Sequence, residues 1–509
     1  MSNYLIGIGG TGAKCIESLV HLLAAGFLPG RAGSVYTCFV DPDQSNGSLS
    51  RSQRTVEAYQ DCRHTPLGTE SGLFETEVAI SQPMVWSPFP GDQPQSLSSF
   101  FCYDDMSNRN VGAGLLFETL FSEDERNTNL NIGFRGHPSI GSAVFANSIE
   151  LSEDEPWRTF RDFVRRDVGA TGETARIVLV GSIFGGTGAA GVPTIGRLIE
   201  EELRKSNVRN AEICAILLLP YFSFDSLHDE QLRADASDFL VNCHAALKYY
   251  HKQDGLKVFD SVYVLGERIQ EPVGQSVIGG RGQVNQPHFI ELIAALAALR
   301  FYETDERGYF LASRREPYSM EWQDLPSHLH SEDIRNRIDH MLRFCFSYLA
   351  VYYPMLNSIG SVGGAYRAPW YIELLSSSTG DFSKDLSGPF AAFSIYSRLF
   401  LEWIGGIQAS GRRTKINLAN SIAFGQNQGE SDTHFTLLSP QSFDWSLFDA
   451  LTLPKMDRRI GSIADLWESM CSSGRLHREL SGPARLLRVL YENCRVSGVT
   501  AQRKEGVGR

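Results

Sequence analysis

Two glycine-rich segments hold the residues of this chain whose types and spacing are best suited to chemistry. The first, GIGGTGAK, spans residues 7–14, and the second, GSIFGGTG, spans residues 181–188. Each follows an apolar run and precedes an amphipathic one, which predicts a strand, a tight loop and a helix. Glycine lets the backbone approach a phosphate closely, while free N–H groups and the helix dipole favour the anion. Both segments therefore predict phosphate binding.

The first segment alone leaves two interpretations open. Gly7, Gly9 and Gly12 form a G-x-G-x-x-G pattern, the fingerprint of dinucleotide binding, and Asp41 ends the predicted second strand. In that fingerprint the ribose-binding acid follows about 20 residues on, and Asp41 lies later. A second glycine loop favours a different ligand, because two loops can hold a polyphosphate from two sides. A nicotinamide-dependent oxidoreductase is thus the less favoured alternative.

The elements around these loops follow a βαβ rhythm, which is typical of a mostly parallel sheet covered by helices. Strands are predicted at about 4–9, 35–41, 176–182, 212–219 and 259–265. Helices are predicted at about 12–25, 112–121, 140–149, 189–206, 227–251 and 286–302. In the second half, helices are predicted near 331–349, 388–405, 463–475 and 480–494, with a short strand around 434–438.

Composition narrows the class of protein. The chain has 509 residues, which is enough for two or three domains of ordinary size, and a formal charge of −12, which argues against nucleic acid as a partner. Its nine cysteines are odd in number and scattered, a pattern typical of reduced thiols in the cytoplasm. We see no signal peptide and no apolar run of the roughly 20 residues that a bilayer helix needs. A cytoplasmic protein is the expectation.

The second loop resembles the signature G-G-G-T-G-[TS]-G of the tubulin/FtsZ superfamily. Further segments resemble that superfamily in the same order along the chain: GGTG followed by Lys14, VDPD at 40–43, GFRGHPSIG at 133–141, PYFSFD at 220–225 and FDSVYV at 259–264. The resemblance covers most of the first 300 residues. The second half more resembles divergent bacterial tubulin-like proteins.

This resemblance implies a fold and a domain organisation. The fold class would be α/β, a Rossmann-like tubulin/FtsZ GTPase domain with a mostly parallel sheet, a core helix and a second, α+β C-terminal domain. The nucleotide-binding domain would span 1–302, including the core helix at about 286–302. Residues 303–509 would form an α+β or mainly helical domain for assembly or partner binding. The core helix would lead from the nucleotide to that second domain.

The resemblance also implies which residues bind GTP or GDP and Mg²⁺. Thr11 and Thr187 would bond phosphate oxygens, Asp41 or Asp43 would hold Mg²⁺ through water, and Asp225 would contact the ribose. Asn285 or Gln286 would hydrogen-bond the guanine edge, or would simply form a polar first turn of the helix. The full set of implied nucleotide-binding residues is Gly9, Gly10, Thr11, Gly12, Lys14, Asp41, Asp43, Arg135, Gly136, Gly185, Gly186, Thr187, Gly188, Asp225, Asn285 and Gln286.

The sequence departs from the superfamily at several of these positions. Phe184 and Ala190 replace signature glycines, and Gly266 stands where FtsZ has an Asn near the base. Arg135 replaces a glycine and is either a charge clamp on the terminal phosphate or a solvated side chain. The loop that completes hydrolysis in a neighbouring subunit, G-x-x-N-x-D-x-x-D, is missing. Asp305 and Glu306 are the candidate catalytic substitutes.

These observations favour a GTP-binding tubulin-like protein, a possible GTPase whose nucleotide controls self-assembly into filaments or oligomers. The missing acid loop favours the alternative of a nucleotide-gated scaffold that hydrolyses GTP poorly and recruits other proteins through residues 301–509. The expected partners are accordingly further copies of the chain, or other proteins bound by the C-terminal half. The sequence does not decide between GTP and ATP.

Overall fold

A computed structural model describes the chain at residues 3–27, 34–65, 68, 71–89, 91, 94–134, 136–150, 154–223, 236–267, 271–272, 280, 285–313, 320–357, 368–375, 387–410, 418, 424–426, 435–437, 463–473, 476–480 and 482–495. At its centre lies a seven-stranded sheet in the order β3-β2-β1-β4-β5-β7-β9, in which every pair of neighbours is parallel. The strands are β1 (Asn3–Ile8), β2 (Ser34–Val40), β3 (Glu77–Trp86), β4 (Ala175–Ser182), β5 (Ala211–Leu218), β7 (Ser261–Leu265) and β9 (Gly308–Ala312).

The two central strands form the core of the sheet. Every residue of β1 and of β4 is buried, which is what a parallel strand covered on both faces requires. The order reverses between these two strands, since the chain runs outward from β1 through β2 and β3 and then returns to β4 on the other side. In such sheets, ligands bind outside the carboxyl ends of the strands at this point of reversal.

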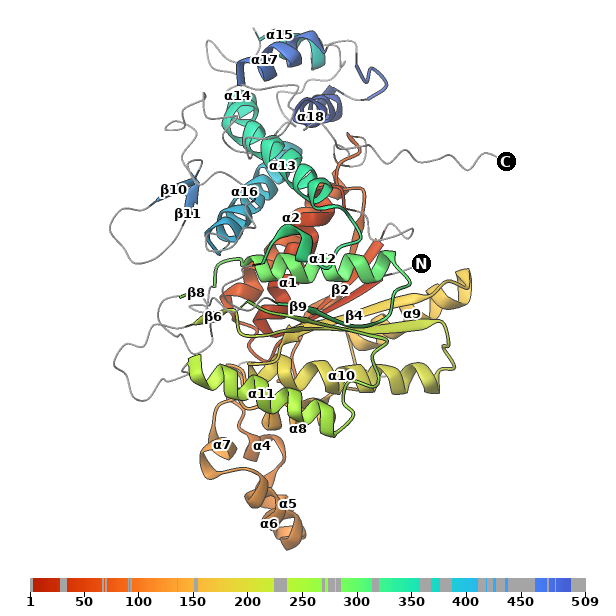
Figure 1. Ribbon diagram of the computed structural model, residues 1–509, viewed down its shortest axis with the longest axis vertical. Coiled ribbons are helices and arrows are strands. Elements are labelled where there is room, and N and C mark those ends of the chain that lie inside the picture. Colours follow the sequence, from red (N-terminus) through yellow and green to blue (C-terminus); the bar gives the residue numbers. More distant parts are fainter. Residues whose placement is uncertain are drawn as a thin grey trace.

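Helices cover both faces of the sheet (Figure 1). On one face lie α1 (Gly9–Ala24), α2 (Gly47–His64) and α12 (Phe289–Glu303), and on the other lie α8 (Pro138–Ser148), α10 (Gly186–Lys205) and α11 (Ala236–Lys252). Helix α9 (Trp157–Thr171) precedes β4. Between β3 and α8, four short helices protrude from the body: α4 (Leu97–Phe100), α5 (Tyr103–Arg109), α6 (Val111–Leu120) and α7 (Glu123–Asn127).

The described part of the second half is mainly helical. Its helices are α13 (Ser331–Ser347), continued by a π-helical turn (Tyr348–Tyr352) and α14 (Tyr353–Asn357), then α15 (Pro369–Leu374), α16 (Ser387–Ser410), α17 (Ile463–Ser472) and α18 (Gly482–Asn493). A 3-10 turn spans Trp322–Asp324, and two short pairs join β6 (Phe222–Ser223) to β8 (Glu271–Pro272) and β10 (Phe424–Gln426) to β11 (Phe435–Leu437).

Helix α16 packs directly on the first helix of the chain. Tyr396 places its hydroxyl 2.9 Å from Nδ1 of His21, and Trp403 donates from Nε1 to the hydroxyl of Ser18 at 3.1 Å. Burial lowers the pKa of His21 to about 3, so this histidine is neutral. The second half is therefore anchored on α1, the helix that begins at the first glycine loop.

After the predicted core helix, α12, the chain returns to the main sheet as β9, which pairs with β7. The sheet thus includes residues beyond 302. The division of the chain into domains of residues 1–302 and 303–509 stays a prediction.

No helix in the described ranges combines the length and the hydropathy that crossing a bilayer requires.

Candidate functional site

The two glycine loops meet at the point where the strand order reverses. The first leaves the carboxyl end of β1, and the second leaves the carboxyl end of β4, the neighbouring strand. Gly9 has φ +74°, and a Cβ placed on it would lie 3.4 Å from Cβ of Thr187. A side chain at Gly9 would therefore be strained and would crowd the second loop, so glycine is what permits the two loops to abut.

Each loop opens a long helix whose N-terminus lacks a side-chain cap. Neither α1 nor α10 receives a capping hydrogen bond from its N-cap side chain, and neither has an acidic residue in its first turn. Gly10, Thr11, Gly185 and Thr187 are half-buried, while the residues around them are buried. Two helix dipoles and their first-turn N–H groups therefore converge on one place, which is an arrangement suited to an anion.

Two further segments border this place. A Cβ on Gly186 would lie 3.1 Å from the backbone nitrogen of Gly136, and a Cβ on Gly10 would lie 3.2 Å from Nδ2 of Asn46. Gly136 itself has φ +79°, the left-handed conformation that favours glycine. The predicted residues Gly9, Gly10, Thr11, Gly136, Gly185, Gly186 and Thr187 are thus brought together. Arg135 and Asp225 lie outside the described residues, so their predicted roles stay predictions.

Gly12 and Gly188 allow close packing of helices on the sheet, whereas the other loop glycines lie at the junction of the two loops. A Cβ on Gly12 would lie 2.6 Å from the carbonyl oxygen of Val180, and a Cβ on Gly188 would lie 2.4 Å from that of Ser182. These distances are shorter than carbon and oxygen tolerate. The two glycines let helices α1 and α10 pack tightly against β4, and so set the position of the loops.

We expect Gly188→Ala to destabilise the protein, because the new methyl group would overlap the backbone of β4. Overpacking of this kind costs about 1–3 kcal/mol of unfolding free energy. The control is Gly169→Ala on α9, where nothing lies within 4 Å of the new Cβ. There alanine should stabilise the helix by about 0.5–1 kcal/mol. Denaturant unfolding of both variants checks the contrast, and equal effects would contradict this role for Gly188.

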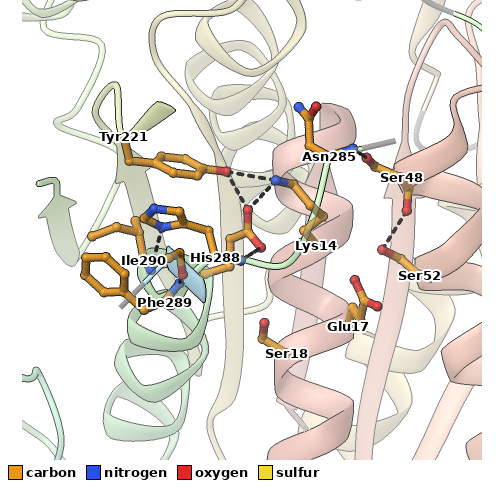
Figure 2. Close-up of polar contacts among 12 residues, drawn as sticks. Lys14, Glu17, Ser18, Ser48, Ser52, Tyr221, Asn285, His288, Phe289 and Ile290 are labelled. Atoms are coloured by element: carbon orange, nitrogen blue, oxygen red, sulfur yellow. Dashed lines mark hydrogen bonds and ion pairs between the residues drawn. The ribbon is translucent and has the colours of Figure 1, made fainter. Parts of the chain in front are cut away.

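Lys14 belongs to a buried polar cluster at the N-terminal ends of α1 and α12 (Figure 2). Its ammonium forms an ion pair with Glu291 and donates to the hydroxyl of Tyr221 at 3.2 Å. Tyr221 in turn donates to Oε1 of Glu291 at 2.6 Å. Burial and the charge of Glu291 raise the pKa of Tyr221 well above its usual value, so the phenol keeps its proton. In this structure Lys14 is thus held by protein groups.

Tyr221 also links this cluster to the first loop, because it accepts from Lys14, the last residue of that glycine-rich segment. His288 packs against Tyr221 with tilted rings, 4.6 Å between their centroids, and caps α12 by accepting from the backbone N–H of Ile290 at Nδ1. Burial lowers the pKa of His288 well below its usual value, so the ring is neutral. The first loop and the start of α12 are therefore joined by one continuous set of contacts.

Asn285 and Gln286 do not cap α12, because His288 does. The backbone of Asn285 is fixed on both sides: its N–H donates to Oγ of Ser48 at 3.1 Å, and its carbonyl accepts from Arg51 at 2.7 Å. The Asn285 side chain points away from the Lys14–Glu291 pair (Figure 2), while Gln286 is exposed. Contact of either amide with a base stays a prediction.

Asp41 and Asp43 follow β2 and are both buried. Oδ1 of Asp41 accepts from the backbone N–H of Asp43 at 3.0 Å, and Asp43 accepts from Ser45 and from the N–H of Gly280, the latter at 2.6 Å. Burial and the neighbouring charge of Asp43 raise the pKa of Asp41 to about 8.

This pair fits the Mg²⁺ that the resemblance implies. The ion prefers oxygen ligands and is commonly bound by one or two carboxylates together with substrate phosphates. Two neighbouring buried carboxylates offer those oxygens, and a cation would relieve the repulsion between them. Within the described ranges, no group of three or more His, Cys, Asp or Glu side chains forms a metal site. The remaining ligands of such an ion would be phosphate oxygens and water.

We expect the raised pKa of Asp41 to appear as a pH dependence of stability. The folded protein keeps a proton on Asp41 that the unfolded chain has released, from the ordinary pKa of 3.8 up to about 8. Stability therefore falls as the pH rises through this window. Because the other titrating groups are common to both proteins, the stability of Asp41→Asn relative to that of the wild type should rise as the pH approaches about 8.

The measurement is chemical unfolding at several pH values, with a chelator present and without nucleotide. Asp105→Asn, which changes an exposed carboxylate on α5, is the control. Parallel pH curves for wild type and Asp41→Asn would show that Asp41 is not the cause.

The candidate catalytic residues lie at the opposite edge of the sheet from the loops. Asp305 pairs with Arg176, which stands near the start of β4, whereas the second glycine loop follows the end of that strand. Glu306 pairs with Arg300 of α12. Both carboxylates are exposed, 95% for Asp305 and 64% for Glu306. Within one copy they cannot reach a ligand at the glycine loops.

Three residues of the site were not singled out from the sequence. Asn46 borders Gly10 and caps α2, and Tyr221 and Glu291 hold Lys14. Glu291 could have been identified from the sequence, since it is the single charged residue in the apolar run from Phe289 to Leu299. A charge placed alone in a buried helix needs a buried partner.

Comparisons with known proteins assign no family to this chain. No family model matches it, and no curated protein matches it. Among solved structures, CetZ2 from Haloferax volcanii, described as a GTPgS-bound protofilament, is similar at 16% identity and a TM-score of 0.27; the match covers 59% of this chain and 58% of that one. CetZ from Methanosaeta thermophila strain DSM 6194 is similar at 13% identity and a TM-score of 0.22, over 52% and 46% of the two chains.

Both matches span less than two thirds of those proteins and describe a distant likeness in fold. The architecture itself is an α/β fold with a seven-stranded, all-parallel sheet.

Proposed function

We propose that this chain binds GTP with its triphosphate between the two glycine loops, and that the bound nucleotide controls association between copies. The observation that carries this proposal is the contact between Gly9 and Thr187 at the carboxyl ends of β1 and β4. Because the two loops are adjacent, the N-termini of α1 and α10 point toward the same position between them. A single phosphate needs one such helix, whereas two converging helices suit a chain of phosphates.

The ligand would be held mainly by the backbone. First-turn N–H groups of α1 and α10 and the hydroxyls of Thr11 and Thr187 would donate to phosphate oxygens. Asp41 or Asp43 would hold Mg²⁺, which neutralises phosphate charge when bound. A site of this composition positions and stabilises charge, as phosphoryl chemistry requires, and contains no strong nucleophile. The preference for guanine rests on the sequence resemblance alone.

A polyphosphate suits this site better than a dinucleotide does. A nicotinamide cofactor would use Gly7, Gly9 and Gly12 and would place its ribose on an acid at the end of β2. Asp41 stands there, but the second loop lies directly beside the first. The oxidoreductase alternative therefore leaves the second loop without a role.

Hydrolysis is a separate question from binding. Because Asp305 and Glu306 lie at the far edge of the sheet, they would act only on a nucleotide bound by a second copy. Their pairing with Arg176 and Arg300 favours the alternative of a scaffold that binds GTP and turns it over poorly, since paired carboxylates are less able to polarise water.

Phosphate release from GTP and ATP, measured as the protein concentration rises, tests these possibilities. The variant is Asp305→Ala/Glu306→Ala, and the control is Glu332→Ala, an exposed acid in the first turn of α13. A GTP-selective rate that climbs faster than linearly and is lost only in the double variant supports hydrolysis between copies. Tight GTP binding without turnover supports the scaffold. Failure to bind any nucleoside triphosphate overturns the proposal.

A further inference from the structure

The segment α4–α7 protrudes from the body of the protein (Figure 1). Its helix α6 presents apolar side chains to solvent. On α6, the side chains of Val111, Leu115, Leu116 and Leu120 are between 58% and 67% exposed. Their spacing of i, i+4, i+5 and i+9 spreads them over about half of the helix circumference. The opposite face carries Phe117, which is buried against the rings of α5 and its flanking residues. We call the four residues the α6 stripe.

A second stripe runs along α11, below the sheet in Figure 1. Leu240, Val241 and Tyr249 are between 53% and 66% exposed, whereas Cys243, Ala246 and Tyr250 on the other face are buried. His244, Lys248 and Lys252 are exposed as well and continue the same face at i+4, i+8 and i+12 from Leu240. The α11 stripe, residues 240, 241, 244, 248, 249 and 252, is thus apolar with a basic border.

The charges around the α6 stripe have the opposite sign. Exposed acids stand beside it on α5 and α7, namely Asp104, Asp105, Glu123 and Asp124, and Glu118 lies on α6 itself. Arg109 pairs with Asp105 and Arg126 pairs with Glu118, so the surroundings of the stripe keep an excess of acids. The two stripes are therefore complementary in charge as well as in apolar character, which favours their mutual association.

The two stripes do not cover one another within a single molecule, because both are exposed in the same structure. We propose that the α6 stripe of one copy packs on the α11 stripe of a second copy. Helix faces with side chains at i and i+4 interlock as ridges in grooves, and apolar patches of this size on a protruding element are typical of interaction sites.

Such a contact joins two different surfaces of the chain. It is heterologous, so repetition leads either to a closed ring or to an open filament. Neither stripe includes a residue that we place in the nucleotide site. The contact therefore stands whether or not GTP is the ligand, and nucleotide binding by the variants below is measured separately.

Analytical ultracentrifugation of the full chain tests the contact, over a wide range of protein concentration, with and without GTP. The wild type should associate, and added salt should weaken the association because charges take part. Leu115→Ser/Leu116→Ser should lower the association constant at least about tenfold, since it removes apolar surface from the centre of the contact. The control is Leu311→Ser, which removes an equally exposed leucine from β9 and should change nothing.

Charge reversal gives a second, independent measurement. Asp104→Lys/Asp105→Lys and Lys248→Glu/Lys252→Glu should each weaken association, and all four changes combined in one chain should restore it, because the complementarity is then swapped. All these side chains are exposed, so the fold should tolerate the changes.

The contact is refuted if the wild type stays a monomer at every concentration, if the stripe variants associate as the wild type does, or if the combined reversal fails to restore association. Binding of the wild type to phosphatidylcholine vesicles that is lost in Leu115→Ser/Leu116→Ser, without any self-association, would also refute it and would make the α6 stripe a membrane contact.

Discussion

Thr187→Asp should weaken GTP binding by roughly a hundredfold or more while leaving the fold as stable as before. Thr187 is the second residue of α10, is half-buried, and adjoins Gly9 of the other loop. A carboxylate there would face the terminal phosphates, and two unit charges about 4 Å apart repel by ~4 kcal/mol near a protein surface. The same carboxylate suits the first turn of a helix, where it stabilises by about 0.3–1 kcal/mol.

Because Thr187→Asp should weaken GTP binding without lowering the stability of the fold, a loss of binding cannot be explained by unfolding. Thr187→Asn is the matched control, because it has the shape of aspartate without the charge. Equilibrium binding of a fluorescent GTP analogue and thermal unfolding are measured on the same samples. If Thr187→Asp binds GTP as the wild type does, the phosphates do not lie at the N-terminus of α10.

Lys14→Met should lower the unfolding free energy by about 3–5 kcal/mol, since it leaves the carboxylate of Glu291 buried without its cation. Both side chains are almost fully buried, with 2% of Lys14 and none of Glu291 exposed. Tyr221 and the backbone N–H of His288 still donate to Glu291, the latter at 2.9 Å, but neither carries a charge. The stem of methionine fills most of the volume of lysine.

A double-mutant cycle separates the ion pair from simple packing. Glu291→Gln keeps the shape of the side chain, and Lys14→Met/Glu291→Gln should be clearly more stable than Lys14→Met alone, because the uncompensated charge is gone. Urea unfolding of the four proteins gives the coupling energy. Additive losses would mean that the two residues act independently. A large loss of GTP affinity at unchanged stability would instead make Lys14 a phosphate ligand, as the resemblance implies.

The βαβ elements around the site could be predicted from the sequence, because their patterns involve residues that are close together in the chain. The buried runs at Tyr4–Ile8 and Ile177–Val180 and the glycines that follow them predicted β1, β4 and their loops to within a residue or two. Elements with weaker patterns were missed, among them β3 and α2. Strand β3 lies at an edge of the sheet and contains Pro83, and α2 buries small polar residues such as Ser52 and Thr55, so neither shows the usual apolar pattern.

The contacts that organise the site were not accessible in the same way. Lys14 and Glu291 are far apart in sequence, and only the packing of α1 beside α12 pairs them. The return of the chain from α12 to β9 was missed because β9 is a short edge strand with exposed Tyr309 and Leu311. Local patterns carry no information about which helix packs beside which.

The central claim is that the two loops hold a chain of phosphates, and titration calorimetry of the full chain with GTP, GMP and NAD⁺ in the presence of Mg²⁺ tests it most directly. We predict that GTP binds and that GMP, which lacks the two outer phosphates, binds at least about a hundredfold more weakly, a difference of ~2.7 kcal/mol. Equal affinity for GTP and GMP, or tighter binding of NAD⁺ than of GTP, would contradict it.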